Sequence, residues 1–251
     1  MRPLITLLTD FGTVDGYVAE MKGVILGAVP EAQVIDVSHE LPTQDVEAGR
    51  LALARYWRRF PAGTIHVAVV DPGVGTDRAA LAVGSDGRYL VGPDNGILSP
   101  ALLFAGARVV ALRIPSGAAA TFHGRDVFAP AAAHLAGGAP LESLGTAVDS
   151  PIIRRTSEPQ RLPDGGIRGE VITIDRFGNA ITNLLAVRGG SVEVAGRTLA
   201  IQRTYADAAD GAPVALAGST GLIEIAVRNG SAAAALGLER GSGVVHRRGE
   251  A

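Results

Sequence analysis

The sequence predicts an α/β domain followed by a smaller all-β domain. In the first 150 residues, short apolar runs alternate with stretches whose apolar residues recur at helical spacing, a pattern typical of a largely parallel sheet joined by right-handed crossovers. After residue 150 the pattern changes to short strands without long helices, which indicates a sandwich or a barrel. We therefore predict an N-terminal α/β domain with a mostly parallel central sheet at 1–155, a linker at 156–168 and an all-β C-terminal domain at 169–251.

Local patterns place the elements of the first domain. Residues 3–9, PLITLLT, are a short apolar run that predicts a buried strand, and the β-branched run at 64–70 predicts another. Apolar residues at helical spacing predict a helix at 16–29. A second helix is predicted at 45–60, where Asp45 favours the positive end of the helix dipole. The remaining strands are predicted at 33–38, 79–83, 89–91 and 109–114, and the remaining helices at 97–104 and 126–136.

The boundary between the domains is marked by residues that interrupt regular structure. Residues 150–169 contain three prolines and a Gly165-Gly166 pair, a composition typical of a linker. The strands predicted beyond it are all short, as expected for a small β domain. They lie at 170–174, 180–184, 192–194, 199–202, 213–217, 222–227 and 244–246.

Composition excludes several classes of protein. The 251 residues include no cysteine, so disulfides, zinc–thiolate sites, iron–sulfur clusters and thiol nucleophiles are excluded. The 25 acidic and 23 basic residues give a formal net charge of −2, which argues against a nucleic-acid-binding protein, since such proteins carry a basic excess. No apolar run approaches the ~18 residues of a membrane span, and Asp10 comes too early for a secretory signal. We expect a soluble, cytoplasmic protein that binds neither nucleic acid nor membrane.

Carboxylates follow two of the predicted strands. Asp10 ends the first strand, Asp15 precedes the next helix, and Asp71 follows the strand at 64–70. Ligands of open α/β sheets bind beyond the carboxyl ends of the strands, where a carboxylate accepts hydrogen bonds from two sugar hydroxyls. Taken singly, Asp10 and Asp15 also fit a turn or a helix N-cap. Together they indicate a binding site at this edge of the sheet.

Two segments carry the candidates for catalysis. DPGVG at 71–75 predicts a rigid turn that lets the backbone approach a ligand, and Arg78 is near enough to fold back on Asp71. That pair fits a reactive site and a structural ion pair equally well. His123, in FHGRD before a predicted helix, is the best placed of the five histidines to titrate in a site.

The second domain offers a recognition segment and a buried acid. In DRFGN at 175–179, Phe177 suits stacking on a flat ring and Asn179 offers a donor and an acceptor side by side, as an adenine edge requires. The same segment fits an ordinary hairpin turn. Glu224 alternates with Leu222 and Ala226 along a predicted strand, so its carboxylate is expected among apolar neighbours. Because burying an unpaired carboxylate is costly, Glu224 has either a structural partner or a cationic ligand.

Seven segments occur in a fixed order along the chain: LLTDFGTVDGYV, DVSHELPTQDVEAG, VAVVDPGVGTDR, LVGPDNGIL, FHGRDVFAPAAAHLA, IDRFGNAITN and STGLIEIAVRNGSAA. In this order and at this spacing they resemble the S-adenosylmethionine hydroxide adenosyltransferases, the hydrolytic relatives of the bacterial fluorinase and chlorinase. The resemblance runs nearly from end to end of the chain, and seven ordered segments make it specific.

The resemblance implies an assembly and a reaction. It implies a two-domain subunit in a homotrimer, with the ligand between the N-terminal domain of one subunit and the C-terminal domain of a neighbour. The implied reaction converts S-adenosyl-L-methionine and water to adenosine and L-methionine, by in-line attack of activated water at C5′, without cofactor or metal. The Asp–Arg–His triad of the family falls on Asp71, Arg78 and His123. We expect Asp71 or His123 to take the proton of the water as the C–O bond forms, with Arg78 positioning the water.

The resemblance also assigns substrate contacts in both domains. They are Asp10 at the ribose hydroxyls, Asp15 and Asp175 near the methionine ammonium, Phe177, Asn179 and the backbone of Val227 to Asn229 at the adenine, and Ser219 near the methionine end, with the buried Glu224 as a further candidate. The chain departs from the fluorinase at three positions. Gln44 stands where the fluorinase has a tryptophan beside the ribose, Thr220 where it has an arginine for the methionine carboxylate, and Gly124 where it has a serine that holds the halide.

Three other functions are open from the residues alone. Asp10, Asp15, Asp71 and His123 offer the oxygen-rich set of a metal-dependent phosphohydrolase, although their spacing is not the tight one expected. A non-catalytic protein that binds S-adenosylmethionine or adenosine predicts stable binding and no product. A halide-dependent halogenase predicts a requirement for chloride, whereas the triad and Gly124 favour water.

Overall fold

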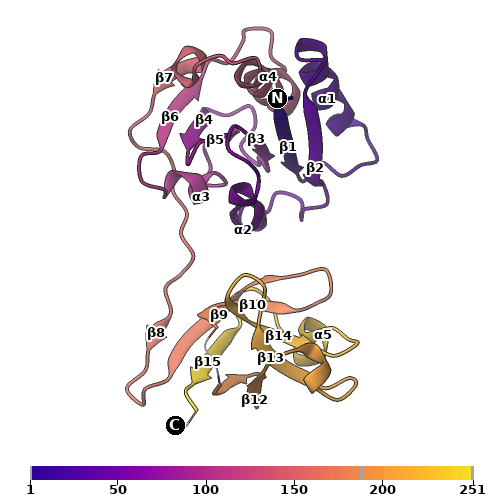
Figure 1. Cartoon of the computed structure of the whole chain (residues 1–251), viewed down its shortest axis with the longest axis vertical. Helices are drawn as coiled ribbons and strands as arrows, with labels where there is room; N and C mark the ends of the chain where they lie inside the picture. Colours follow the sequence, from indigo (N-terminus) through magenta and orange to yellow (C-terminus); the bar gives the residue numbers. More distant parts are fainter. Residues whose placement is uncertain (1, 187–188, 250–251) are drawn as a thin grey trace. The chain divides into compact units, whose positions relative to one another are not determined.

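The computed structural model describes residues 2–186 and 189–249. The chain divides into two compact units, Met1–Arg155 and Thr156–Ala251 (Figure 1). Residues 156–168, predicted as a linker, include the short strand β8 (Gln160–Arg161), which pairs with the start of the next strand, β9. Each unit has a hydrophobic core of its own.

The first unit is built on a seven-stranded sheet in the order β2-β1-β3-β5-β4-β6-β7. Its class, α/β, is as predicted. Strands come from every stretch that the apolar runs indicated, and one short strand, β7, was not predicted. The strands are β1 (Leu4–Thr9), β2 (Gln33–Ser38), β3 (Ile65–Val69), β4 (Ala80–Ser85), β5 (Arg88–Pro93), β6 (Arg108–Leu112) and β7 (Gly145–Ala147).

The sheet is mixed, whereas the sequence pattern predicted a mostly parallel one. β2, β1, β3 and β5 run parallel, and β4, β6 and β7 are antiparallel to their neighbours. The change of direction occurs at a two-residue turn between β4 and β5, where Asp86 and Gly87 have φ of 47° and 70°. Positive φ at both central residues is what a tight hairpin needs, and a hairpin makes its two strands antiparallel.

Helices cover both faces of this sheet. Leu7 and Leu8 of β1 belong to different core clusters, because successive side chains of a strand point to opposite faces. The Leu7 face packs against α1 and α4, and the Leu8 face against α2 and α3 (Figure 1). The helices are α1 (Tyr17–Ala28), α2 (Val46–Tyr56) with a 3-10 turn at Trp57–Arg59, α3 (Ser99–Leu102), α4 (Ala129–Ala136) preceded by a π-helical turn at Gly124–Phe128, and a 3-10 turn at Leu141–Leu144.

The second unit is a β barrel. Its strands pair in the order β10-β14-β13-β12-β11-β15-β9, and β9 also pairs with β10, which closes the ring and decides between the two all-β forms that the sequence left open. Ala232–Leu236 forms a short helix, α5, that was not predicted, because four alanines and one leucine show no periodicity. The strands are β9 (Ile167–Ile174), β10 (Ala180–Leu185), β11 (Ser191–Val194), β12 (Arg197–Gln202), β13 (Pro213–Ala217), β14 (Leu222–Val227) and β15 (Gly243–Arg247).

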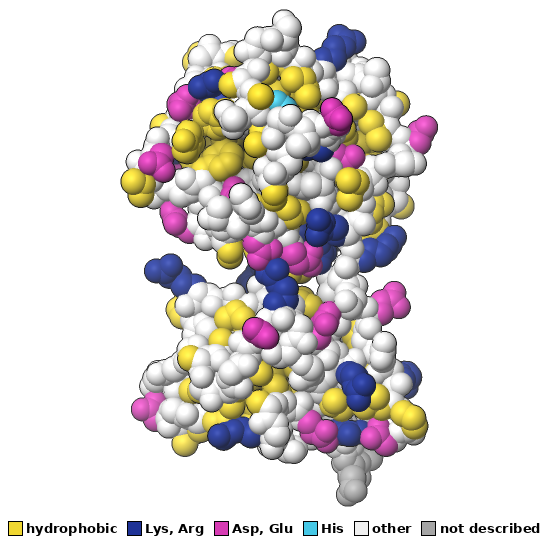
Figure 2. Space-filling model, turned by 180° about the vertical axis from the view of Figure 1, so that it is seen from behind, with side chains coloured by type: hydrophobic (Ala, Val, Ile, Leu, Met, Phe, Trp, Pro, Cys, Tyr) yellow, Lys and Arg dark blue, Asp and Glu magenta, His cyan; other side chains and the backbone are white. Residues whose placement is uncertain are grey.

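The surface charge and the helix lengths relate to the nucleic-acid-binding and membrane classes that the composition argued against. On the face drawn in Figure 2, basic and acidic side chains are interspersed over both units. Within the part of the chain that the structure describes, no helix has both the length and the hydropathy to cross a membrane.

Candidate active site

Two of the predicted site carboxylates follow adjacent parallel strands. Thr9, the last residue of β1, is in register with Val69, the last residue of β3, so Asp10 and Asp71 leave the sheet at the same edge. Asp10 accepts a hydrogen bond from the backbone amide of Gln44, 2.7 Å from its Oδ2, and Gln44 adopts a φ of 62° to donate it. This edge is where ligands of open α/β sheets bind.

Asp71, Arg78 and His123 form one hydrogen-bonded cluster. Nε of Arg78 donates to Oδ1 of Asp71 over 3.0 Å, and Nη2 of Arg78 donates to the second carboxylate oxygen. Nη2 also lies 2.8 Å from Nδ1 of His123. The side chains of Asp71 and Arg78 are only 5% and 9% exposed, so this is a buried ion pair with a histidine attached.

The turn at 71–75 and the loop before His123 meet at a close approach. Gly75 has a φ of 79°, and a Cβ on it would lie 2.7 Å from the carbonyl oxygen of Ala120. A side chain at 75 would therefore push the two loops apart. The strand end before Asp71 is held by Asn95, whose side-chain amide donates to the carbonyl of Val70 over 2.8 Å. The PDNG turn at 93–96 thus holds the end of the strand that precedes Asp71.

His123 is neutral in this cluster. Burial lowers the pKa of His123 below its usual 6.5, and the charge of Arg78 lowers it further, against the opposing effects of Asp71 and Asp126. Because a guanidinium only donates hydrogen bonds, Nδ1 of His123 must accept the one from Arg78. The neutral ring therefore carries its proton on Nε2. In this tautomer Nε2 is a hydrogen-bond donor.

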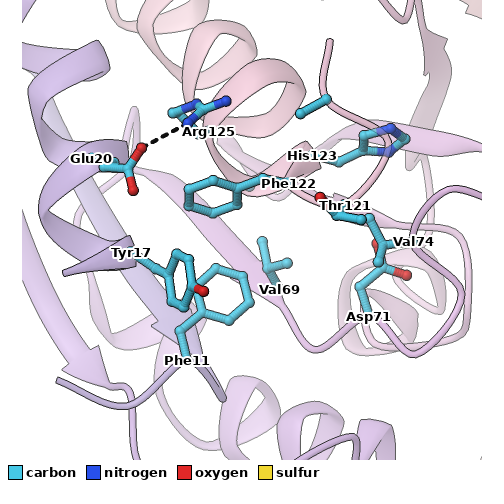
Figure 3. A pocket seen from close by; sticks show the side chains of 12 residues that line it. Phe11, Tyr17, Glu20, Val69, Asp71, Val74, Thr121, Phe122, His123 and Arg125 are labelled. Atoms are coloured by element: carbon cyan, nitrogen blue, oxygen red, sulfur yellow. Dashed lines mark hydrogen bonds and ion pairs between the residues drawn. The ribbon is translucent and has the colours of Figure 1, made fainter. Parts of the chain in front are cut away.

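A cavity of about 420 Å³ opens beside the cluster. Asp71, Val74 and His123 line one end (Figure 3). The other end is lined by aromatic side chains and by Glu20 and Arg125, which form an ion pair of 2.7 Å.

Arg125 and Asp126 organise the loop that carries His123. Nε and Nη2 of Arg125 donate to the two carboxylate oxygens of Asp126 over 2.7 and 2.9 Å, and this contact lowers the pKa of Asp126. Asp126 also accepts from the backbone amide of Ala119 over 2.8 Å. The guanidinium lies 5.0 Å from the ring centroid of Phe122. Phe122, before His123, and the loop residue Ala119 therefore both contact the Arg125–Asp126 salt bridge.

Asp15 does not join these contacts. It lies exposed in the loop before α1, two residues ahead of Tyr17. Its exposed side chain makes no hydrogen bond within residues 2–186 and 189–249.

In the second unit, Asp175 holds the β9–β10 turn. Its Oδ1 accepts from the backbone amides of Phe177 and Asn179, each over 2.9 Å, and its Oδ2 accepts from the side-chain amide of Asn179 over 3.0 Å. The turn projects Phe177 into solvent with 76% of the residue exposed. The carbonyl of Gly178 accepts from Ala233 of α5 over 2.9 Å, which brings this turn beside the segment that follows Val227. An exposed aromatic ring on a fixed turn is a surface suited to stacking.

Glu224 has a protein partner, Tyr205. The hydroxyl of Tyr205 donates to Oε1 of Glu224, and that hydrogen bond raises the pKa of Tyr205 to about 12. The residue Glu224 is 8% exposed. The sequence allowed either a structural partner or a cationic ligand for Glu224, and the structure contains a structural partner. Ser219 lies exposed in the turn before β14, and Asn229 lies exposed beyond it with a φ of 55°.

Comparison with known proteins identifies the family. The model of the SAM hydroxide adenosyltransferase N-terminal domain matches residues 5–145, and that of the C-terminal domain matches residues 169–245. The chain belongs to the SAM hydroxide adenosyltransferase family. It is 47% identical to an (R)-S-adenosyl-L-methionine hydrolase from Thermus thermophilus, over 96% of this chain and 98% of the relative. It is 30% identical to a fluorinase from Actinopolyspora mzabensis, over 97% and 96% of the two chains. A solved structure from Thermotoga maritima superposes with a TM-score of 0.88 at 32% identity, covering 97% of this chain and 100% of that one.

In this member of the family, the positions that differ from the fluorinase have distinct surroundings. The exposed Gln44 holds Asp10 through its backbone, so that contact does not depend on its side chain. Gly124 is enclosed: a Cβ there would lie 3.1 Å from ring carbons of Phe11 and Phe122 and 3.2 Å from the sulfur of Met21. Thr220 lies exposed in the turn before β14.

Sequence reasoning missed several residues of the site. Glu20 and Arg125 are 105 positions apart, and no local pattern in the sequence connects them. Tyr17 and Phe11 were read only as parts of a helix and a strand end. Tyr205 carries no motif, and the requirement that buried Glu224 find a partner was the one signal that pointed to it.

The residues considered for a metal site, Asp10, Asp15, Asp71 and His123, are not arranged as the ligands of one metal ion. Among residues 2–186 and 189–249, no group of three or more His, Asp or Glu side chains is arranged to hold a metal ion. Asp71 instead pairs with Arg78.

Proposed function

We propose that this chain hydrolyses S-adenosyl-L-methionine to adenosine and L-methionine. The observation that carries the proposal is the buried cluster of Asp71, Arg78 and His123 at the sheet edge of a chain that belongs to the SAM hydroxide adenosyltransferase family. The relative from Thermus thermophilus is named as a hydrolase of the (R) form. Because L already describes the α-carbon, (R) describes the sulfonium, and we extend that preference to this chain.

The chemistry needs a nucleophile more than it needs help for the leaving group. A sulfonium departs as a neutral thioether, so the C5′–S electron pair goes to sulfur without build-up of charge. What is missing is a water held behind C5′ in line with that bond. Holding reactants in such an arrangement removes up to about 7–11 kcal/mol of a barrier. We assign that task to Arg78 and to Nε2 of His123, which have N–H groups to donate to a water.

Asp71 takes the proton in this proposal. Each carboxylate oxygen has about two lone-pair sites, so Asp71 accepts from Arg78 and has capacity left for a water. Neutral His123 accepts from Arg78 at Nδ1 and is a donor at Nε2, so it has no lone pair to offer a water. As oxygen bonds to C5′, the water proton passes to Asp71 and the sulfur leaves. Adenosine, methionine and the proton now on Asp71 together account for all atoms and for the positive charge of the substrate and water.

The substrate contacts are proposed from the resemblance and from where the side chains lie. Asp10 takes the ribose hydroxyls, with its free lone pairs beside the Gln44 amide. Asp15 and Asp175 take the methionine ammonium and Ser219 the methionine end. Phe177, Asn179 and the backbone of Val227 to Asn229 take the adenine, and the described contact between the 175–179 turn and α5 supports placing those segments together. Glu224, on the face of β14 opposite to the barrel core, bonds Tyr205 and supports this surface from that side.

The homotrimer, with each ligand shared between neighbouring subunits, and the cytoplasmic location stay predictions. The trimer is checked by the mass of the purified protein in solution.

Water is favoured over halide as nucleophile by the packing at Gly124. The halide-holding serine of the fluorinase would need a Cβ at this position, where three neighbouring side chains stand within 3.2 Å. That distance is shorter than ordinary van der Waals contact, so a serine side chain requires the surrounding rings to move.

A product assay tests the proposal. EDTA-treated protein is incubated with the (R) and (S) forms of S-adenosyl-L-methionine in chloride-free buffer, and the products are separated by chromatography. We expect equal adenosine and methionine from the (R) form, and a loss of at least about 100-fold in Asp71→Asn. Asp77→Asn, at an exposed position of the same loop, is the matched control.

Other outcomes assign the alternatives. Substrate that stays intact while bound identifies a binding protein without turnover. A 5′-chloro product that forms only with added chloride identifies a halogenase. Activity lost in EDTA and restored by magnesium identifies a metal-dependent enzyme. Each of these results overturns the hydrolase proposal.

A further inference from the structure

The cavity beside Asp71 has an aromatic wall to which the mechanism gives no role. Phe11, Tyr17 and Phe122 pack edge to face in all three pairs, with ring centroids 5.2 to 6.2 Å apart. They come from the loop after β1, the first residue of α1 and the segment before the π-helical turn. All three line the cavity that Asp71 and His123 line at its other end (Figure 3). An aromatic wall thus faces the proposed site of bond cleavage.

The charges around the cavity favour a cation. Glu20 and Arg125 line it, and Asp126 pairs with Arg125 from outside the cavity. At the catalytic end Asp71 pairs with Arg78. Three carboxylates against two guanidinium groups leave one net negative charge, and His123 adds no positive charge while it is neutral. Positive charge entering this cavity is therefore attracted to it.

We propose that the aromatic wall of Phe11, Tyr17 and Phe122 binds the sulfonium centre and its S-alkyl group, and that it separates adenosyl sulfonium cations from neutral adenosyl thioethers. This inference rests on the proposed function, since it assumes that adenosyl sulfonium compounds enter the site. A sulfonium has no N–H or O–H to donate. Aromatic faces and carboxylates are the groups that attract such a cation.

The size of the cavity extends the substrate class. A volume of about 420 Å³ is far more than one S-methyl group occupies. The wall is formed by the three rings, with the Tyr17 hydroxyl as its one polar group, and the Glu20–Arg125 ion pair lines the cavity with them. Adenosyl sulfonium compounds with an S-ethyl or S-propyl group are therefore accepted in place of S-methyl.

The wall also favours release of product. The sulfonium loses its charge when the C5′–S bond breaks, so the neutral thioether keeps only its apolar contact with the rings. Attraction between cation and ring is lost at that moment. The wall therefore acts on substrate binding, and its loss changes affinity for the cation more than the rate of the bond-breaking step.

Binding measurements test this inference separately from turnover. Tyr17→Leu removes a ring while keeping an apolar side chain, and Tyr17→Phe is the matched control that keeps the ring. Both are made in an Asp71→Asn background, and Asp71→Asn alone is the reference, so the carboxylate lost with Asp71 is missing from every protein compared. The dissociation constants of S-adenosyl-L-methionine and the neutral S-adenosylhomocysteine are measured by calorimetry. We expect Tyr17→Leu to weaken binding of the cation about three- to tenfold, with the thioether changed by less than a factor of two and Tyr17→Phe without effect.

The contrary results are distinct. Equal weakening of both ligands would show that the rings only pack the loop, and it overturns the inference, as does unchanged binding of the cation. If thermal melting shows that Tyr17→Leu is unfolded, two measurements take its place. They are the binding of both ligands to Phe122→Leu and the relative binding of S-ethyl and S-methyl substrates. An S-ethyl compound that does not bind overturns the inference. Because binding is measured without turnover, a wild-type chain that binds the cation but makes no adenosine refutes the proposed function and leaves this result standing.

Discussion

Nη2 of Arg78 donates to Nδ1 of His123 over 2.8 Å and so determines which ring nitrogen holds the proton of the neutral imidazole. The same guanidinium grips both carboxylate oxygens of Asp71. One planar side chain therefore sets the orientation of an acid and the tautomer of a histidine at once. Four expected outcomes follow from this and from other contacts of the first unit.

Arg78→Lys should lower kcat for S-adenosyl-L-methionine by about 100-fold or more, while the protein stays folded. A lysine ammonium keeps the charge but lacks the planar fork that reaches Asp71 and His123 together. Steady-state kinetics and thermal melting check this. The exposed Arg58, paired with Asp86, is a matched position, and Arg58→Lys should leave kcat unchanged. Equal rates for wild type and Arg78→Lys would refute the role of the fork.

Activity should fall on the acid side as His123 gains a proton. Burial and Arg78 lower the pKa of His123, so the neutral ring persists below the usual 6.5 and the fall lies at more acidic pH than an ordinary histidine would give. Protonation removes the acceptor for Arg78 and places two cations side by side. The dependence of kcat/KM on pH measures this.

The companion variant is Asp126→Asn. Its carboxylate raises the pKa of His123, so its removal should move the acidic fall to still lower pH. An acid limb that stays in place in this variant would mean that another group governs it.

Gly124→Ala should cost about 1–3 kcal/mol of the free energy of unfolding, because its Cβ meets Phe11, Phe122 and Met21 within 3.2 Å. Gly23→Ala is the control in α1, where a Cβ meets nothing within 4 Å. That change should stabilise the protein by about 0.5–1 kcal/mol, since glycine is unfavourable inside a helix. Denaturant titration of both variants gives the two values. A Gly124→Ala protein as stable as wild type would show that the rings relax freely.

His66 should make the fold sensitive to acid. It is fully buried, with Nδ1 2.8 Å from the hydroxyl of Thr6, and burial lowers the pKa of His66 to about 4. The unfolded chain binds this proton near pH 6.5, so stability is fully present above that pH and is lost as the pH falls towards 4. The difference amounts to about 3 kcal/mol. Melting curves of wild type and His66→Gln between these pH values measure it, and the variant should lose less. Parallel curves would assign the loss to other groups.

Much of the first unit could be predicted because its signals are local. The apolar runs at 3–9 and 64–70 became β1 and β3, and Asp71 and Arg78 are near enough in sequence for their pairing to be expected. The direction of β4 was missed although Asp86-Gly87 between two apolar runs is a hairpin signal. The short elements β7, β8 and α5 lack the length over which periodicity is read.

The aromatic wall lay outside the reach of sequence patterns for a different reason. Tyr17 and Phe122 meet at 5.2 Å across more than a hundred positions, and their contact exists only once α1 and the loop before α4 pack on the same face of the sheet. The tautomer of His123 is likewise a property of one contact in three dimensions, invisible in FHGRD.

The pairing of Asp71 with Arg78 also constrains how this site evolves. Both side chains are less than a tenth exposed. Replacing Asp71 alone therefore leaves the buried guanidinium of Arg78 without a counter-charge, and replacing Arg78 alone leaves the buried carboxylate of Asp71 without one. Evolution towards a different nucleophile must therefore replace Asp71 and Arg78 together. His123 loses the hydrogen bond from Arg78 in the same step. A lineage that changes from water to another nucleophile is expected to replace these residues in a coordinated set of substitutions. Proteins that carry only one of the substitutions are expected to be the least stable in that lineage.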